Sequence, residues 1–280
     1  MRRRYRSPPV RTPIWVGMAA RSSHQRVSAV SDGVAGGTPA GKCSLHVGFA
    51  LEGTGRMIDR PLVVVFDVNE TLSDLRPLVR RFADVGAPPH LLRVWFAGVL
   101  RDGFALTAAG AGERFAVLAA DGLRSVLHGL PLDRDVDAAV EHVLAGFAAL
   151  GVHPDVPDGV RALRAAGCRL VTLSNGSVDV AERLLVGAGV RAEFARLLSV
   201  EDAGVWKPAR GAYRYAAQVC GVDAADMMLV AVHPWDIDGA RRAGLKAAWV
   251  DRTGAPYPAY FTRPSVTATG LGDLARRVTA

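Results

Sequence analysis

The sequence holds an aspartate that could act as a nucleophile, together with three further polar segments that could assist it. Asp67 closes the apolar run 62–66, and a carboxylate at the carboxyl end of a buried strand is costly unless it is paired or used. Taken alone, Asp67 could equally be a residue that caps the next helix. Three more segments favour a catalytic role for Asp67. They are Ser174-Asn175-Gly176-Ser177, Trp206-Lys207-Pro208 and His233-Pro234-Trp235-Asp236-Ile237-Asp238.

Each segment supplies a different chemical group. Ser174 and Asn175 offer hydroxyl and backbone N–H donors at the start of a helix, where anions are commonly held. Lys207 offers an ammonium group, and Asp236 and Asp238 place two acids on the first turn of a helix. Singly, these features are also typical of a helix N-cap, a solvated lysine and capping acids. Together they predict a site for a small anionic substrate.

The elements that must position these groups alternate along the chain. Continuous apolar, β-branched runs are typical of strands buried on both faces of a parallel sheet. The predicted strands are 62–66, 168–173, 227–232 and 246–250, and the predicted helices between and after them are 158–166, 180–188, 209–220 and 236–243. This alternation predicts an α/β fold with a doubly wound (Rossmann-like) parallel sheet. Glycines expected just past helices are Gly167, Gly189, Gly221 and Gly244.

Residues 73–153 break this alternation. They show helical patterns and no convincing strand; the predicted helices are 76–85, 91–106, 112–127 and 136–150. An insertion after the first strand of a parallel sheet would lie over its carboxyl edge, where open α/β sheets bind ligands. We therefore predict an all-helical cap domain at 73–153, inserted into a core formed by 58–72 and 154–280.

The net charge of +7 is confined to the first 57 residues. This segment has nine Arg and Lys against two acidic residues, so the remaining 223 residues are neutral, with 25 charges of each sign. Its Arg-, Ser-, Gly- and Pro-rich composition predicts a disordered basic leader. The alternatives are an over-long start with Met57 as the true initiator, a transit peptide, and a tail that touches nucleic acid. The charge gives no reason to expect nucleic-acid binding by the core.

Composition excludes other classes of protein. The three cysteines, Cys43, Cys168 and Cys220, are too few and too scattered for a disulfide framework or a CxxC metal pattern. We therefore expect a reduced, cytoplasmic setting. No stretch approaches the roughly 18 consecutive apolar residues of a membrane-spanning helix, so no membrane partner is expected.

In their order and spacing, the polar segments resemble the haloacid dehalogenase superfamily, in particular its type II 2-haloacid dehalogenase branch. The shared pattern is a strand ending in Asp67 with Thr71 four residues later, then the Ser-Asn-Gly-Ser loop, Lys-Pro and an acidic loop containing Trp235-Asp236. Tyr213 matches a tyrosine that follows Lys-Pro in that branch. The resemblance covers 58–280 and implies a metal-independent (S)-2-haloacid dehalogenase without a cofactor and, as is common in the family, a homodimer.

The resemblance also implies a role for each catalytic residue. Asp67 would attack the halogen-bearing carbon and form an ester that water then hydrolyses. Lys207 would keep Asp67 ionised, Thr71 would orient it, and Asp236 would hold Lys207 or position the water. The implied substrate-binding residues are Ser174, Asn175, Asn69, Phe96, Tyr213 and His233.

Three of these residues depart from the pattern of the branch. Asn69 stands two residues after the nucleophile, where dehalogenases have Tyr and phosphatases have an Asp that protonates the leaving oxygen. Phe96 stands where dehalogenases carry a cap Arg after a Trp, with Arg93 and Arg101 on other helix faces. His233 replaces the Asn before Trp-Asp, and could serve as a base for ester hydrolysis or only as a packing residue.

Two other functions remain open. One is a Mg²⁺-dependent phosphohydrolase in which Asp67, the Asn69 backbone carbonyl and Asp236 or Asp238 ligate the ion through oxygen atoms, as Mg²⁺ requires. Asn69 weakens this alternative, because an amide cannot protonate a leaving group. The other is a binding module of the same fold without turnover, which the absence of the cap Arg favours.

Overall fold

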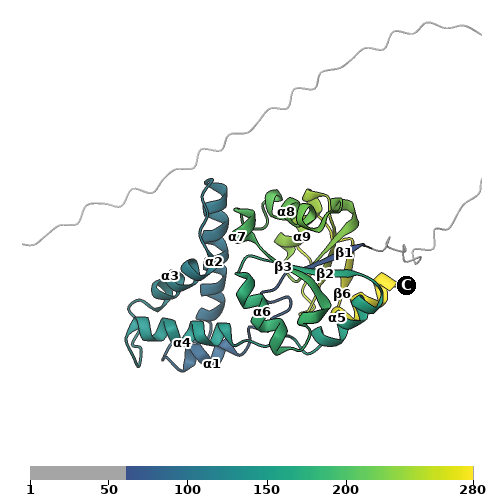
Figure 1. Ribbon diagram of the computed structural model, residues 1–280. Helices are drawn as coiled ribbons and strands as arrows, with labels where there is room; N and C mark the ends of the chain where they lie inside the picture. The colour runs from purple at the N-terminus through teal and green to yellow at the C-terminus, as the bar shows by residue number, and fades with distance from the viewer. Residues whose placement is uncertain (1–60, 280) are drawn as a thin grey trace, which may run out of the picture. The chain divides into compact units, whose positions relative to one another are not determined.

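The computed structural model describes residues 61–279, and the prediction for the first 57 residues lies outside this range. Its central feature is a six-stranded parallel sheet of order β3-β2-β1-β4-β5-β6 (Figure 1). The strands are β1 (Val63–Phe66), β2 (Arg169–Ser174), β3 (Phe194–Ser199), β4 (Met227–Ala231), β5 (Lys246–Val250) and β6 (Val266–Ala268). The predicted α/β, doubly wound fold class is confirmed.

Strand β1 lies inside this sheet between partners that come from far along the chain. Val65 pairs with Val171 of β2 on one side and with Leu229 of β4 on the other. The order of the strands reverses at this point, because β2 and β3 extend to one side of β1 and β4 to β6 extend to the other. The carboxyl end of β1 is thus at the topological switch point, where open parallel sheets bind ligands.

Helices cover both faces of the sheet. Side chains alternate across a strand, so Val63 and Val65 join one hydrophobic cluster with α8 and α9, while Val64 and Phe66 join a second with α5, α6 and α10. These helices, with the short α7, are α5 (Val156–Ala165), α6 (Val178–Gly187), α7 (Val200–Ala203), α8 (Arg210–Cys220), α9 (Pro234–Ala243) and α10 (Leu271–Thr279). Burial on both faces holds the end of β1 in a fixed position.

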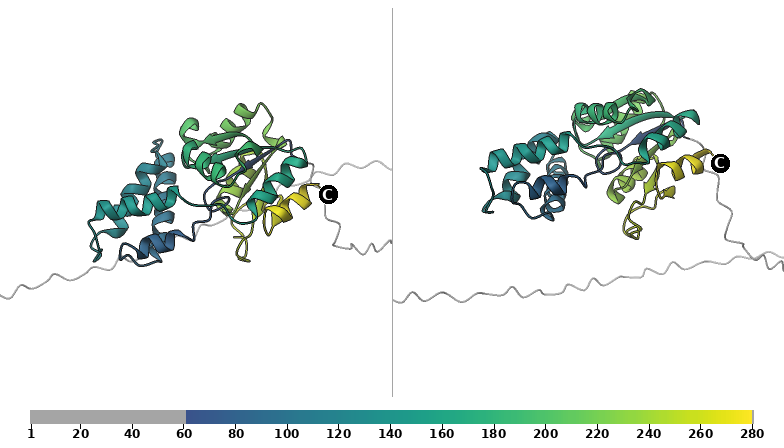
Figure 2. Two further views of the ribbon diagram at one scale, coloured as in Figure 1. Left: turned by 60° about the horizontal axis from the view of Figure 1, so that its bottom comes forward. Right: turned by 90° about the horizontal axis from the view of Figure 1, so that it is seen from below.

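Four helices between β1 and α5 form what we call the helical insertion. They are α1 (Leu78–Ala83), α2 (Leu91–Ala108), α3 (Phe115–Leu127) and α4 (Val136–Ala148), and they pack together at one side of the sheet region (Figure 2). The fully buried Trp95 lies at their centre, where its indole N–H donates to the carbonyl of Ala119 at 2.9 Å. The chain enters and leaves the insertion side by side, since Ser73 and Val152 form an antiparallel bridge.

The strongly apolar strands were predicted and the edge strands were not. The bounds of β1, β2, β4 and β5 agree with the predicted ranges to within one residue. Edge strand β3 exposes Ala195 and Arg196, and this polar interruption hides it from a search for apolar runs. Edge strand β6 has only three residues, with Thr267 exposed. The four glycines expected past helices all have positive φ, between 64° and 99°.

Candidate active site

A lysine and two aspartates form a buried cluster at the carboxyl edge of the sheet. Lys207 Nζ donates to Asp67 Oδ1 at 2.8 Å and to Asp236 Oδ2 at 2.6 Å. The side chains of Lys207 and Asp236 are 0% exposed and that of Asp67 is 5% exposed. Burying a charge is costly unless it is paired and hydrogen-bonded, and here one ammonium is shared by two carboxylates.

Three separate segments of the chain bring this cluster together. Asp67 directly follows β1, Lys207 lies in the loop between α7 and α8, and Asp236 lies in the first turn of α9 after β4. Helix α9 approaches the Lys207 loop closely because Gly239 has no side chain. A Cβ at Gly239 would lie 2.6 Å from Tyr213 Oη and 2.6 Å from Pro208 Cβ.

The second oxygen of Asp67 accepts two further hydrogen bonds. Thr71 Oγ1 donates to Asp67 Oδ2 at 2.7 Å, and His233 Nδ1 lies 3.1 Å from the same oxygen. Because the backbone N–H of Val232 donates to Thr71 Oγ1 at 3.1 Å, the Thr71 hydroxyl proton is directed at Asp67. Burial alone would raise the pKa of Asp67, but Lys207 and His233 outweigh it and hold that pKa well below its usual range. Asp67 is therefore a carboxylate, the form that a nucleophile requires.

Both carboxylate oxygens of Asp236 accept hydrogen bonds. Its Oδ1 accepts a hydrogen bond from the Tyr213 hydroxyl at 2.5 Å, while Oδ2 accepts from Lys207. Burial would lower the pKa of Lys207, but Asp236 and Asp67 raise it above its ordinary value. Burial raises the pKa of Asp236, and burial together with Asp236 raises that of Tyr213 well above its ordinary value. Tyr213 thus contacts the cluster, as a neutral donor.

The Ser174–Ser177 loop lies beside the cluster and supports it. The side chain of Asn175 is bonded twice to the backbone of Lys207: its Oδ1 accepts from the Lys207 N–H at 3.0 Å, and its Nδ2 donates to the Lys207 carbonyl at 3.3 Å. Ser174 Oγ accepts from the Gly176 N–H at 2.9 Å. Asn69 Nδ2 lies 3.7 Å from where a Cβ of Gly176 would be, so Asn69 adjoins the same loop. The Asn175 side chain thus positions Lys207.

His233 connects Asp67 to a glutamate that the sequence did not predict. His233 Nε2 lies 2.9 Å from Glu70 Oε2, on the opposite side of the ring from Asp67. Burial would lower the pKa of His233, but the hydrogen bonds to Asp67 and Glu70 raise it to about 9. The ring stacks on Trp235 with centroids 5.0 Å apart. Glu70 carries no separate signal in the sequence, because its partner is 163 residues further along the chain.

The helical insertion reaches the site through α2. Phe104 packs edge-on against Trp235 with ring centroids 4.9 Å apart. One turn later, Thr107 Oγ1 accepts from the backbone N–H of Trp206 at 3.2 Å. A Cβ at Gly103 would lie 2.4 Å from the Trp206 ring, so this crossing requires glycine. Helix α2 therefore packs against the loop that carries Lys207 and the first turn of α9, which carries Asp236.

Phe96 packs inside the helical insertion, and its predicted contact with substrate stays a prediction. Its ring packs against Trp95 and Phe115 in the aromatic centre of the helical insertion, and the residue is 5% exposed. An apolar ring at this position is accounted for by packing within the insertion. Arg93, one turn earlier on α2, instead lines a cavity of about 600 Å³ together with Glu70 and His233.

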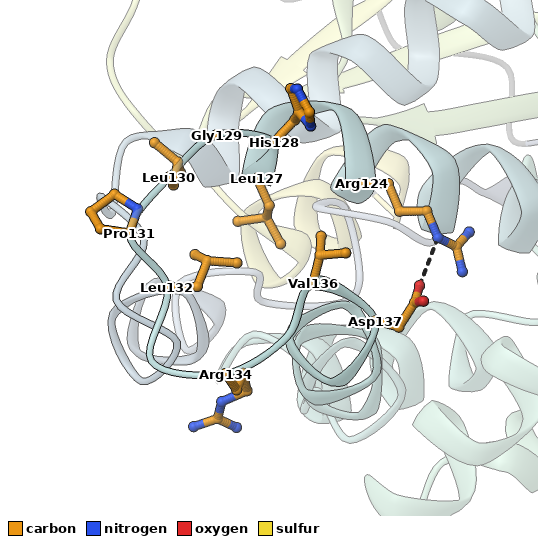
Figure 3. Close-up of a pocket in the computed structure, with 10 residues that line it drawn as sticks. All are labelled: Arg124, Leu127, His128, Gly129, Leu130, Pro131, Leu132, Arg134, Val136 and Asp137. Atoms are coloured by element: carbon orange, nitrogen blue, oxygen red, sulfur yellow. Dashed lines mark hydrogen bonds and ion pairs between the residues drawn. The ribbon is translucent and has the colours of Figure 1, made fainter.

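The insertion also contains a cavity of its own. This cavity, of about 470 Å³, lies between the end of α3 and the start of α4, and Arg124 pairs with Asp137 along it (Figure 3). His128 lines it as well. None of the predicted site residues contributes to this cavity, so we treat it as separate from the cluster around Asp67.

The carboxylates of the cluster do not suit a magnesium ion. The oxygens of Asp67 and Asp236 face an ammonium and other hydrogen-bond donors, and such a set leaves no pair of carboxylate oxygens for a hard cation. Asp238, which the metal-dependent alternative could use, accepts from the Thr262 N–H and from Arg242 Nε, both at 2.8 Å. Within residues 61–279, no group of three or more His, Cys, Asp or Glu could hold a metal ion. In the same range, no helix has the length and apolar character needed to cross a membrane.

Comparisons with known proteins identify the family. Residues 62–244 match the family described as haloacid dehalogenase-like hydrolase. The chain is 30% identical to an (S)-2-haloacid dehalogenase of Pseudomonas sp. (strain YL) over 74% of this chain and 90% of that protein. It is 28% identical to haloacetate dehalogenase H-2 of Moraxella sp. (strain B), over 73% and 92% of the two chains.

A solved structure with a covalently bound ligand is also similar. The L-2-haloacid dehalogenase from Xanthobacter autotrophicus with chloropropionic acid covalently bound superposes with a TM-score of 0.70 and 25% identity, over 78% of this chain and 98% of that chain. The fold is thus shared over nearly the whole of that protein. On its match to the family and its relatives, the chain belongs to the haloacid dehalogenase-like hydrolases.

Proposed function

We propose that this protein is an (S)-2-haloacid dehalogenase that uses Asp67 as its nucleophile. The observation that carries the proposal is the ionised, buried Asp67 at the end of β1, held 2.8 Å from Lys207. The relatives named above support the substrate class, since two of them are (S)- or L-2-haloacid dehalogenases.

In the first step, an Asp67 oxygen attacks the carbon that bears the halogen. The new carbon–oxygen bond forms as the carbon–halogen bond breaks, and the halide leaves with the bonding electrons. Halide needs no proton to leave, so Asn69 in place of an acid is no obstacle. Lys207, Thr71 and His233 hold the carboxylate in one orientation, which lowers the entropic cost of reaching the transition state.

The substrate carboxylate would be held by the loop that follows β2. Ser174 supplies a hydroxyl, and the loop leads into α6, whose N-terminal N–H groups favour an anion. The Asn175 side chain keeps Lys207 in place beside the bound substrate. We further propose that the helical insertion acts as a cap, because the contact of Phe104 with Trp235 shields the cluster from bulk water.

In the second step, water attacks Cγ of the Asp67 ester and releases the 2-hydroxyacid. No step needs a metal ion, since Lys207 already supplies the positive charge beside the nucleophile. Asp238, the acid that favoured a metal-dependent phosphohydrolase, is instead paired with Arg242.

We expect halide release from (S)-2-chloropropionate at an unchanged rate in excess EDTA. The reason is that the ammonium of Lys207 occupies the place where a cation would pair with Asp67 and Asp236. The measurement is halide release over a panel of 2-haloacids and phosphate esters, each with EDTA and with added Mg²⁺. Phosphate-ester hydrolysis that appears only with Mg²⁺ would contradict the proposal, and binding of haloacids without turnover would point to the non-catalytic module.

A further inference from the structure

The backbone carbonyl of Thr71 is bonded to a distant arginine. Thr71 is fully buried, and Arg252 Nη2, 181 residues further along the chain, donates to its carbonyl at 3.0 Å. Within residues 61–279, no other donor is bonded to this carbonyl. A buried carbonyl without a partner is costly, so the position of Thr71 depends on Arg252.

Thr71 is the residue through which this bond reaches the nucleophile. Its hydroxyl donates to Asp67 Oδ2 at 2.7 Å and accepts from the backbone N–H of Val232 at 3.1 Å. Because hydrogen bonds weaken when they are bent or lengthened, a shift of the Thr71 backbone would spoil at least one of these two bonds. Asp67 would then lose a donor that fixes the rotation of its carboxylate.

Arg252 is itself held by a carboxylate at its other terminal nitrogen. Nη1 donates to Asp155 Oδ1 at 2.9 Å, and Asp155 Oδ2 accepts from the Leu271 N–H at 2.7 Å. Burial would raise the pKa of Asp155, but the bond from Leu271 and the charge of Arg252 outweigh it and lower that pKa. Asp155 is therefore a carboxylate at neutral pH. It directly precedes α5, and Leu271 begins α10, so two helices of the core hold the guanidinium in place.

A guanidinium suits this arrangement because it is planar and rigid. Its two terminal nitrogens have a fixed separation, so the Asp155 carboxylate and the Thr71 carbonyl are held at a fixed distance from each other. A lysine ammonium carries the same charge at a single point and cannot reproduce this geometry. Only 18% of the Arg252 side chain is exposed, and its Nε is buried with no partner among the described residues. The two bonds at the end of the side chain therefore fix its orientation.

The neighbours of Thr71 in the turn after β1 are held by a different segment. The N–H of His153 donates to the Leu72 carbonyl at 2.9 Å, and His153 Nε2 lies 2.9 Å from the Glu70 carbonyl. These bonds tie the turn to the segment that returns from the helical insertion, and they do not involve the Thr71 carbonyl. Loss of Arg252 should therefore shift Thr71 while the turn as a whole stays folded.

We propose that Arg252 is a positioning residue for the nucleophile: by holding the Thr71 carbonyl, it keeps the Thr71 hydroxyl directed at Asp67 during attack on the substrate. This inference rests on the proposed dehalogenase function. Arg252 lies between β5 and β6, outside the four polar segments in which the sequence predicts catalytic residues. It acts through Thr71, since it forms no hydrogen bond with Asp67 itself.

The test is a double-mutant cycle on halide release from (S)-2-chloropropionate in a single turnover, with the protein in excess. Halide leaves in the first step, so its rate reports the attack by Asp67. Arg252→Met should lower the maximal rate about tenfold or more, because a small displacement of a positioned group has effects of this size. The protein concentration that gives half the maximal rate should stay within about twofold of wild type, since substrate binding is not changed. In a Thr71→Val background, which has no hydroxyl to direct, adding Arg252→Met should cost less than about twofold.

Two further variants separate geometry from charge and from folding. Arg252→Lys keeps the charge and should lose about as much rate as Arg252→Met; it takes the place of that variant in the cycle if Arg252→Met does not fold. Arg242→Met, which removes an exposed arginine paired with Asp238, is the matched control and should keep the wild-type rate. A wild-type rate in Arg252→Lys, or losses that multiply when Arg252 and Thr71 are both replaced, would overturn the inference and leave the dehalogenase function standing. Wild-type protein that releases no halide would overturn the proposed function itself.

Discussion

Replacement of Asp67 by Asn lowers kcat for halide release by at least about ten-thousand-fold, the scale expected when a nucleophile is removed. The amide has nearly the same shape, and its one oxygen can still accept from Lys207, while its NH2 group takes the place of the oxygen that accepts from Thr71. It lacks the negative charge that displaces the halide. The measurement is steady-state halide release, with the folded state checked by its melting temperature.

Asp238→Asn is the matched control for this variant. Asp238 is also an acid at the carboxyl edge, but it bonds to Arg242 and to the backbone of Thr262. Its kcat should stay within about twofold of wild type. Equal losses in the two variants would show that the effect of Asp67→Asn is not specific to the nucleophile.

Replacement of Lys207 by Met lowers kcat about a thousand-fold at neutral pH and moves the acid limb of the pH–rate profile to higher pH. Without the shared ammonium, burial raises the pKa of both Asp67 and Asp236, and two neighbouring buried carboxyls do not both ionise readily. A protonated Asp67 is not a nucleophile. The pH–rate profile distinguishes this cause from simple misfolding, since activity should partly return as the pH rises.

The same substitution changes how stability depends on pH. In the wild type the pKa of Asp67 lies below its ordinary value, so its ionisation contributes stability that is present above that ordinary pKa and is lost as the pH falls. In Lys207→Met the pKa of Asp67 lies above the ordinary value, so stability is instead lost as the pH rises. Breaking a buried pair costs about 3–5 kcal/mol. Urea unfolding across pH measures both effects, and Arg242→Met, which removes an exposed cation, should show neither.

Most residues of the site can be predicted from the sequence, because polar residues interrupt its regular apolar patterns at the ends of strands and the starts of helices. Asp67, Lys207 and Asp236 each follow a strand or open a helix of a recognisable pattern. Parallel strands end at the same edge, so the topology predicts that Asp67 and Asp236 lie close together, whereas Lys207 lies between two helices. The direct contacts of Lys207 with both carboxylates could not be read from spacing, since they span 140 and 29 residues.

Other features depend on side-chain directions that the sequence does not encode locally. Glu70 becomes the partner of His233 only because a left-handed turn directs it there. The side chain of Asn175 is hydrogen-bonded to the backbone of Lys207, 32 residues further along the chain, while the contact of Asn175 with substrate stays a prediction. Phe96 lies on a helix with apolar residues on more than one face, and packing against Trp95 and Phe115 decides its direction. In each case a tertiary contact fixes the role.

The proposed covalent role of Asp67 is tested most directly by a single turnover in ¹⁸O-labelled water with the protein in excess over (S)-2-chloropropionate. If Asp67 forms the ester, water attacks its Cγ, and mass spectrometry should find the label in the Asp67 carboxylate while the product hydroxyl carries unlabelled oxygen. Label in the product hydroxyl with none in Asp67 would mean that water attacks the substrate directly, and would contradict the account.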